Sequence, residues 1–223
     1  DWKYARACFN DYPKAKRYWD WRLMLEEMDG DIDAVMVATA DHTHAAIAAQ
    51  AITMGKHIYC QKPLTHSVYE SRLLTRLARE YRVATQMGNQ GHSAESTAQI
   101  RDWIKAGSIG KVTEVIGYSR KNYGTLVQPV QGAVIPKTLD WNLWLNRAEE
   151  IPFSTSYLNR EWIRFSHFSG VVGDMATHIL HVCDHKELLN AHDKWVPAAR
   201  LLVAFHSQNI DQARSLVDSI ALS

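Results

Sequence analysis

The sequence predicts an α/β fold with a parallel sheet in its first half. Short apolar segments alternate there with longer segments that show helical periodicity, and strands separated by helices are typical of right-handed βαβ units. Each apolar segment is followed by polar residues or glycines, as expected of ligand-binding loops at the carboxyl edge of a parallel sheet. The 223 residues are 46% hydrophobic, which is sufficient for a buried core.

Helices are predicted where apolar residues recur with helical spacing between start and stop signals. Ser67 and Glu70 have the spacing of a capping box at the start of one helix, while Gly55 and Gly107 are placed to end two others. Besides the helix that begins after Ser67, we expect helices over Trp2–Phe9, Asp20–Met28, His44–Met54, Ala94–Ala106 and Asp174–Leu189.

Three segments in the first half are predicted to be strands. Asp33–Ala38 contains a continuous apolar run, which is typical of a strand buried on both faces. His57–Cys60 and Val83–Gln86 are predicted to be two further, shorter strands.

The pattern changes after position 110. Lys111–Tyr118 alternates apolar and polar residues, as in a strand with one solvated face. Asn122–Pro136 carries the glycines and prolines of an irregular loop, and tryptophans gather after it, at Trp141, Trp144 and Trp162. We therefore predict two domains, residues 1–110 and residues 111–223.

Composition excludes several classes of protein. The formal net charge is +1, and no run of lysines or arginines exceeds two residues, so a nucleic-acid partner is not expected. Three widely spaced cysteines give no disulfide framework. No apolar run approaches the roughly 20 residues that span a membrane. No export signal is visible, and the compartment stays open between cytoplasmic and exported.

Polar side chains follow the first predicted strand, where a helix begins. Thr39, Asp41, His42 and His44 lie at this position, and the crevice at the carboxyl end of a parallel sheet, next to free helix N-terminal amides, favours anionic ligands such as a dinucleotide. The alternative is that Asp41 and Thr43 only cap the helix. No metal site is expected, because no carboxylate or cysteine lies at ligand spacing from the two histidines.

The loops after the other two strands also carry candidate residues. Pro63 restricts the backbone of Lys62 to extended conformations, and a lysine desolvated at a strand end can serve as an acid or hydrogen-bond donor. The glycines of Gln86–Gly91 allow the backbone to approach a ligand closely. An exposed lysine before a turn, and a plain turn, are the alternative interpretations.

A carboxylate and a histidine share one face of the predicted helix in the second half. Asp174 and His178 are spaced i and i+4, and a carboxylate in that position can orient an imidazole that acts as a general base. His181 and His185 extend the cluster, so a row of zinc ligands or a solvated cluster are alternatives.

Taken together and in this order, these segments resemble the glucose–fructose oxidoreductase and inositol dehydrogenase (Gfo/Idh/MocA) family. The resemblance rests on A-T-A-D-H-T-H at 38–44, Q-K-P-L-T-H-S at 61–67 and T-Q-M-G-N-Q-G at 85–91, and extends over about 1–178. It implies a Rossmann-type parallel sheet followed by the start of an α+β C-terminal domain, which in the family often mediates homo-oligomers. It also implies that the whole protein oxidises or reduces a sugar or cyclitol with NAD or NADP.

The resemblance also assigns roles to individual residues. Lys62 corresponds to the lysine of the family's E-K-P motif, and Asp174 with His178 to its D-x-x-x-H pair. The implied reaction passes a hydride to nicotinamide while His178 takes the hydroxyl proton, Asp174 orients His178 and Lys62 hydrogen-bonds the reacting oxygen. Cofactor contacts are implied for Thr39, His44, Gln61 and Asn89, and a substrate contact for His181. From their positions after the predicted strands, Asp41, His42 and Lys62 are also expected to contact the cofactor. Three departures are Gln61, where glutamate is usual, Ala40, where proline is usual, and His181, where the family often has an aspartate that contacts substrate.

One expected element is missing from these residues. No G-x-G-x-x-G motif occurs, so we expect residues 1–110 to form an incomplete Rossmann-type domain without its first strand and glycine loop, and to bind NAD weakly. Two further hypotheses stay open. One is a glycosidase that oxidises its sugar transiently with bound NAD, and the other is an inactive chain that binds a partner.

Overall fold

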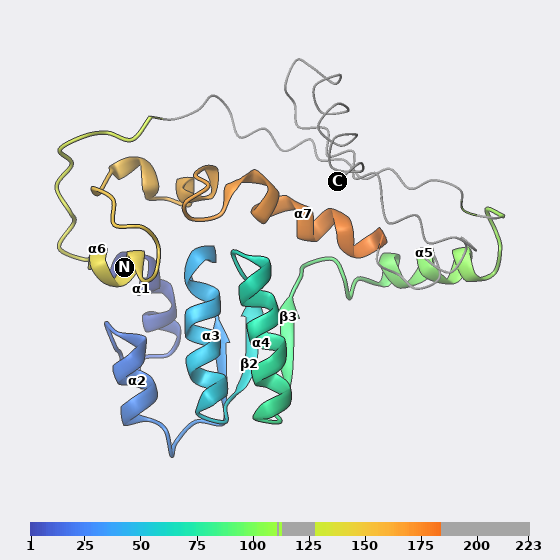
Figure 1. Cartoon of the computed structure of the whole chain (residues 1–223), viewed down its shortest axis with the longest axis horizontal. Helices are drawn as coiled ribbons and strands as arrows, with labels where there is room; N and C mark the ends of the chain where they lie inside the picture. Colours follow the sequence, from blue (N-terminus) through green and yellow to red (C-terminus); the bar gives the residue numbers. More distant parts are fainter. Residues whose placement is uncertain (111, 113–127, 184–223) are drawn as a thin grey trace. The chain divides into compact units, whose positions relative to one another are not determined.

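A computed structural model describes residues 1–110, 112 and 128–183 (Figure 1). The described residues divide into two units, the first formed by residues 1–88 and 128–174 and the second by the remainder. Three expectations fall outside the described residues. They are the strand at Lys111–Tyr118, of which only residue 112 is described, the end of the last predicted helix over 184–189, and His185. The domain boundary near residue 110 stays a prediction.

The first unit contains a three-stranded parallel sheet, which confirms the α/β class. Its strands are β1 (Ala34–Val37), β2 (His57–Gln61) and β3 (Thr85–Gly88), in the order β1-β2-β3. Val37 pairs with Cys60 and Cys60 with Met87, so the three strands end at the same edge of the sheet.

Two details of the predicted strands are wrong. In β1, Val35 and Val37 are buried but Met36 is 70% exposed, because the helices that pack on the sheet lie over one of its faces (Figure 1). β3 begins two residues later than expected, because the amide of Val83 donates to the carbonyl of Ala78 at the end of the preceding helix.

The predicted helices are found with bounds that agree to within four residues where the structure describes them, whereas α6 was not predicted. The capping box is confirmed, since Ser67 accepts from the amide of Glu70 and Glu70 accepts from the amide of Ser67. Gly55 and Gly107 end their helices with positive φ angles, which a glycine adopts without strain. The α-helices are α1 (Trp2–Asp11), α2 (Trp21–Glu27), α3 (His44–Thr53), α4 (Val68–Glu80), α5 (Glu95–Lys105), α6 (Trp141–Leu145) and α7 (Gly170–Cys183).

Three short 3₁₀ helices complete the described elements: η1 (Asp41–Thr43), η2 (Thr155–Tyr157) and η3 (Glu161–Arg164). No helix in the described ranges is long and apolar enough to cross a membrane.

Two apolar clusters form the core of the first unit. One lies between the sheet and α3 and α4, and includes Val37, Ile52 and Cys60. The other contains three tryptophans: Trp141 stacks on Trp144 with ring centroids 4.8 Å apart, and Trp162 packs against the same cluster. These cores hold the loops after β1 and β2 in place.

Candidate functional site

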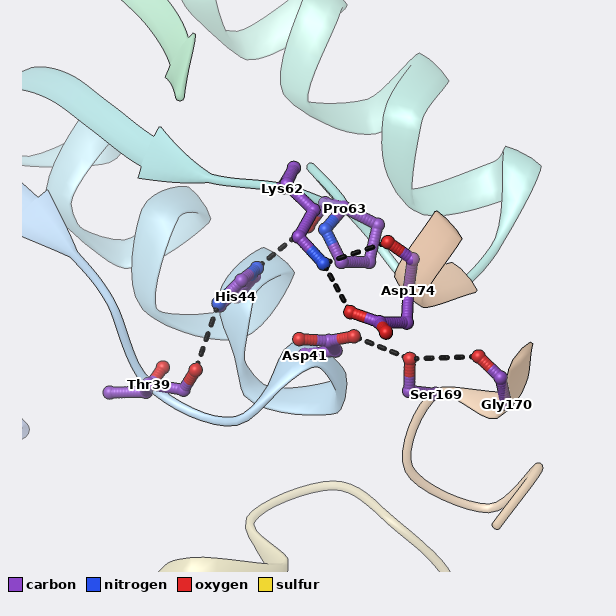
Figure 2. Close-up of polar contacts among 8 residues, drawn as sticks. All are labelled: Thr39, Asp41, His44, Lys62, Pro63, Ser169, Gly170 and Asp174. Carbon is purple, nitrogen blue, oxygen red and sulfur yellow. Dashed lines mark hydrogen bonds and ion pairs between the residues drawn. The ribbon is translucent and has the colours of Figure 1, made fainter. Parts of the chain in front are cut away.

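Buried charged and polar side chains gather at the carboxyl ends of β1 and β2 (Figure 2). Asp41 lies in η1, directly after β1, and Lys62 follows the last residue of β2. Ser169 precedes α7 and Asp174 lies in its second turn. The peptide bond between Lys62 and Pro63 is cis.

Lys62 and Asp174 form a nearly dry ion pair. The Nζ of Lys62 donates to the Oδ1 of Asp174 at 2.5 Å and to the Asp174 backbone carbonyl at 2.8 Å. The two side chains are 14% and 5% exposed, respectively. A buried charge is tolerated when it is paired and hydrogen-bonded, and each partner supplies this for the other.

Asp41 is the second buried carboxyl group of the site. The hydroxyl of Ser169 donates to its Oδ2. Burial raises the pKa of Asp41 above its ordinary value, and the carboxylate of Asp174 acts in the same direction. The Ser169 hydrogen bond and the positive charge of Lys62 oppose this rise.

The imidazole of His44 lies between two backbone carbonyls. Its Nδ1 lies 2.7 Å from the carbonyl oxygen of Pro63, and its Nε2 lies 3.2 Å from that of Thr39. The residue is 1% exposed. His44 therefore links the loop after β1 to the turn that carries Lys62.

His42 is packed among aromatic rings. Its Nε2 lies 2.9 Å from the carbonyl oxygen of Trp144, and its ring centroid lies 4.8 Å from that of Trp144 and 4.9 Å from that of Phe168. Burial lowers the pKa of His42 from 6.5 to about 4, so the ring is neutral at neutral pH and Nε2 carries the proton that binds Trp144.

The interpretation of Asp41 and Thr43 as helix caps is wrong. Neither side chain accepts from a backbone amide at the start of η1 or α3. The hydroxyl of Thr43 instead donates to the carbonyl of Ala40 and lies 2.6 Å from the hydroxyl of Thr39.

The remaining predicted residues are placed as follows. Gln61 is the half-buried last residue of β2. In the second unit, Asn89 donates to the carbonyl of Thr177 at 3.0 Å, and its Oδ1 is buried with no hydrogen-bond partner among the described residues. His178, which is half-buried, and His181 both lie in α7.

Sequence reasoning missed Ser169. A serine before a helix is an ordinary N-terminal residue, and only its distance in space from Asp41 marks it, since 128 positions separate the two in sequence. Within residues 1–110, 112 and 128–183, no group of three or more His, Cys, Asp or Glu side chains is arranged to hold a metal ion.

Comparison with known proteins gives a family match for the sheet-forming part of the chain. Residues 3–89 match the family model described as "Oxidoreductase family, NAD-binding Rossmann fold", of the Gfo/Idh/MocA type. The levoglucosan dehydrogenase of Pseudarthrobacter phenanthrenivorans is 28% identical over 161 residues, which are 72% of this chain and 34% of that protein. The scyllo-inositol 2-dehydrogenase (NAD(+)) of Bacillus subtilis is 35% identical over 92 residues, 41% of this chain and 27% of that protein.

Solved structures support the fold. An NAD-binding protein from Listeria innocua aligns with a TM-score of 0.53 at 20% identity, over 84% of this chain and 44% of that one. An oxidoreductase from Pseudomonas syringae aligns with a TM-score of 0.51 at 22% identity, over 78% of this chain and 37% of that one. The chain spans between about a quarter and a third of the length of the curated relatives that it matches.

Proposed function

We propose that the protein is an NAD(P)-dependent oxidoreductase, because residues 3–89 match the model of the Gfo/Idh/MocA oxidoreductase family with its NAD-binding Rossmann fold. Its substrate is a sugar or cyclitol, and the reaction transfers a hydride between a carbinol carbon and nicotinamide. Two of its relatives, named for levoglucosan and for scyllo-inositol, support this substrate class.

The observation that carries the proposal is the hydrogen bonding of the Lys62 ammonium group. An ammonium group has three N–H donors, and within the described residues Asp174 takes two of them. The third can donate to the oxygen of a substrate hydroxyl or carbonyl. The two contacts with Asp174 hold the Lys62 ammonium in one orientation, as a donor needs.

The position of the site and its hydrogen-bonding groups suit a dinucleotide. The carboxyl edge of a parallel sheet is where such ligands bind in open α/β folds, and Lys62 lies at this edge. Asn89 directly follows β3, and its buried Oδ1 has no partner among the described residues, so it can accept from a ligand N–H. We assign Lys62, Gln61, Thr39 and Asn89 to hold the cofactor, which supplies the hydride acceptor or donor when bound.

The remaining steps belong to this chain's side chains. Lys62 donates an N–H to the reacting oxygen and stabilises the negative charge that develops there as its proton leaves. His178, one helical turn after Asp174, takes that proton as general base and returns it in the reverse direction. The family resemblance assigns the substrate contact to His181. Burial of Asp41 and Asp174 limits the entry of water beside the ammonium.

Turnover of Lys62 and Lys56 variants tests the proposal. The two lysines flank β2, each is mostly buried and each is paired with an aspartate, Lys56 with Asp29 at 2.8 Å. Purified protein is given NAD⁺ or NADP⁺ and a panel of sugars and cyclitols, and reduced nicotinamide is followed by its absorbance. Lys62→Ala should reduce kcat by about 10²-fold or more, as loss of a transition-state donor does, while Lys56→Ala should retain most of it.

Two outcomes would count against the proposal. Equal losses in Lys62→Ala and Lys56→Ala would show that the lysines matter only for stability. Glycoside cleavage without net reduced nicotinamide would instead favour a glycosidase that uses the cofactor transiently.

A further inference from the structure

Two polar contacts hold the first turns of α7 against the strand ends. One is the ion pair of Lys62 with Asp174, from the end of β2, and the other is the hydrogen bond of Ser169 with Asp41, from the loop after β1 (Figure 2). Ser169 and Asp174 are only five positions apart in sequence. Displacement of Ser169 is therefore expected to displace Asp174 as well.

The Ser169 hydroxyl is closely confined. Its Oγ lies 3.3 Å from the carbonyl oxygen of Gly170, besides contacting Asp41. A hydroxyl has one proton to donate, and a carboxylate is the stronger acceptor, so the proton goes to Asp41. A Cβ on Gly173 would lie 2.9 Å from this Oγ, closer than side-chain carbons approach. The bare backbone at 173 thus leaves room for the serine.

The charged form of Asp41 is disfavoured by its surroundings. The residue is 5% exposed, and burial and the nearby carboxylate of Asp174 act against the charge, although Lys62 and His44 favour it. What the geometry uses is the acceptor atom Oδ2, which reaches the start of α7. An asparagine side chain offers an acceptor of the same shape without the charge.

We propose that Asp41 is a positioning residue, which fixes the start of α7 through Ser169 and so holds Asp174 against the ammonium of Lys62. The inference rests on the proposed function for the importance of Lys62, but its test does not. The position of Asp41 after β1 predicted a contact with the cofactor; the role proposed here for its side chain is within the protein.

Acetylation of lysines in the native protein measures this coupling without cofactor or turnover. N-acetoxysuccinimide reacts with free amines, so an ammonium held by Asp174 reacts slowly. Mass spectrometry of the peptides gives the separate rates at Lys62 and at Lys56. The rate at Lys56 reports general loosening of the fold, because Lys56 lies at the opposite end of β2.

We expect Ser169→Ala and Asp41→Ala each to raise the acetylation rate of Lys62 by roughly tenfold, as loss of about one hydrogen bond predicts, and to leave Lys56 unchanged. Asp41→Asn should preserve the slow rate at Lys62. Combining Asp41→Ala with Ser169→Ala should add nothing further, since both remove the same bond. Gly173→Ala, which crowds Ser169, should also raise the rate at Lys62.

An unchanged rate at Lys62 in both alanine variants would overturn the proposal. So would a parallel rise at Lys62 and Lys56, which would indicate loss of the fold. If Asp41→Ala does not fold, Ser169→Ala decides alone, because it removes only one oxygen atom. A fast rate in Asp41→Asn would show that charge, rather than the hydrogen bond, is what matters.

Discussion

The ammonium of Lys62 is bound twice by one residue, since Asp174 offers it both a carboxylate oxygen at 2.5 Å and a backbone carbonyl at 2.8 Å. The two residues are 112 positions apart in the sequence. The pair joins the strand that ends before Lys62 to the helix that carries the D-x-x-x-H spacing.

Breaking this pair on one side should be costly. Lys62→Ala removes the ammonium that pairs with the buried carboxylate of Asp174, and we expect the free energy of unfolding to fall by about 3 kcal/mol, as for other broken buried pairs. Lys62→Met combined with Asp174→Leu removes both charges and should recover most of that loss. Chemical denaturation measures both.

The same double variant separates stability from chemistry. It should unfold near the wild-type denaturant concentration and still show no turnover, because it lacks the donor. A double variant that is stable and active would remove Lys62 from the mechanism.

His42 should make stability depend on pH. Its folded pKa is about 4 and its unfolded value is 6.5, so between these values the unfolded chain binds a proton that the folded chain does not. Stability attributable to His42 is therefore complete above pH 6.5 and is lost as the pH falls towards 4, with a limit of about 3 kcal/mol. In His42→Phe, which keeps the aromatic packing, unfolding curves measured across this range should depend less on pH. Equal slopes for the variant and the wild type would contradict the assignment.

His44 is expected to stabilise the protein by linking two loops. His44→Phe keeps an aromatic ring but loses the contacts to the carbonyls of Pro63 and Thr39, and should reduce the free energy of unfolding by about 1–3 kcal/mol because buried acceptors lose their donor. His44→Gln, which retains an N–H donor, should lose less. Identical losses in the two variants, measured by denaturation, would show that ring packing rather than hydrogen bonding explains the position.

The cysteines should differ in reactivity. Burial raises the pKa of Cys60 to about 12, and its side chain is in the core, whereas Cys8 is exposed. Iodoacetamide should therefore label Cys8 in the native protein and leave Cys60 unlabelled until denaturant is added. Peptide mass spectrometry reads this directly, and rapid native labelling of Cys60 would contradict its placement.

Local patterns predicted most of the described fold. Helical periodicity, the Ser67 capping box and the glycines at 55 and 107 depend on neighbouring residues, and the structure confirms them. The burial of β1 on both faces was a wrong prediction, because whether Met36 is covered depends on which elements pack over it rather than on the strand's own sequence.

The site was predictable only in part. Lys62, Asp41 and Asp174 stood out because they are charged residues next to strand ends or in helical register. The partners of Asp41 and His44 did not, since Ser169 and the Pro63 carbonyl are recognised only when the chain brings distant segments together. His42 and His44 look alike in sequence, yet one contacts an aromatic cluster and the other two backbone carbonyls.

Transfer of deuterium is the most direct test of the proposed reaction. The protein would be given NAD⁺ or NADP⁺ with sugars and cyclitols that carry deuterium on their carbinol carbons, and the nicotinamide product would be examined by mass spectrometry. The account predicts reduced cofactor that carries one deuterium, and its loss in Lys62→Ala but not in Lys56→Ala. Reduced cofactor without deuterium, or no reduction by any sugar or cyclitol in the panel, would contradict hydride transfer at this site.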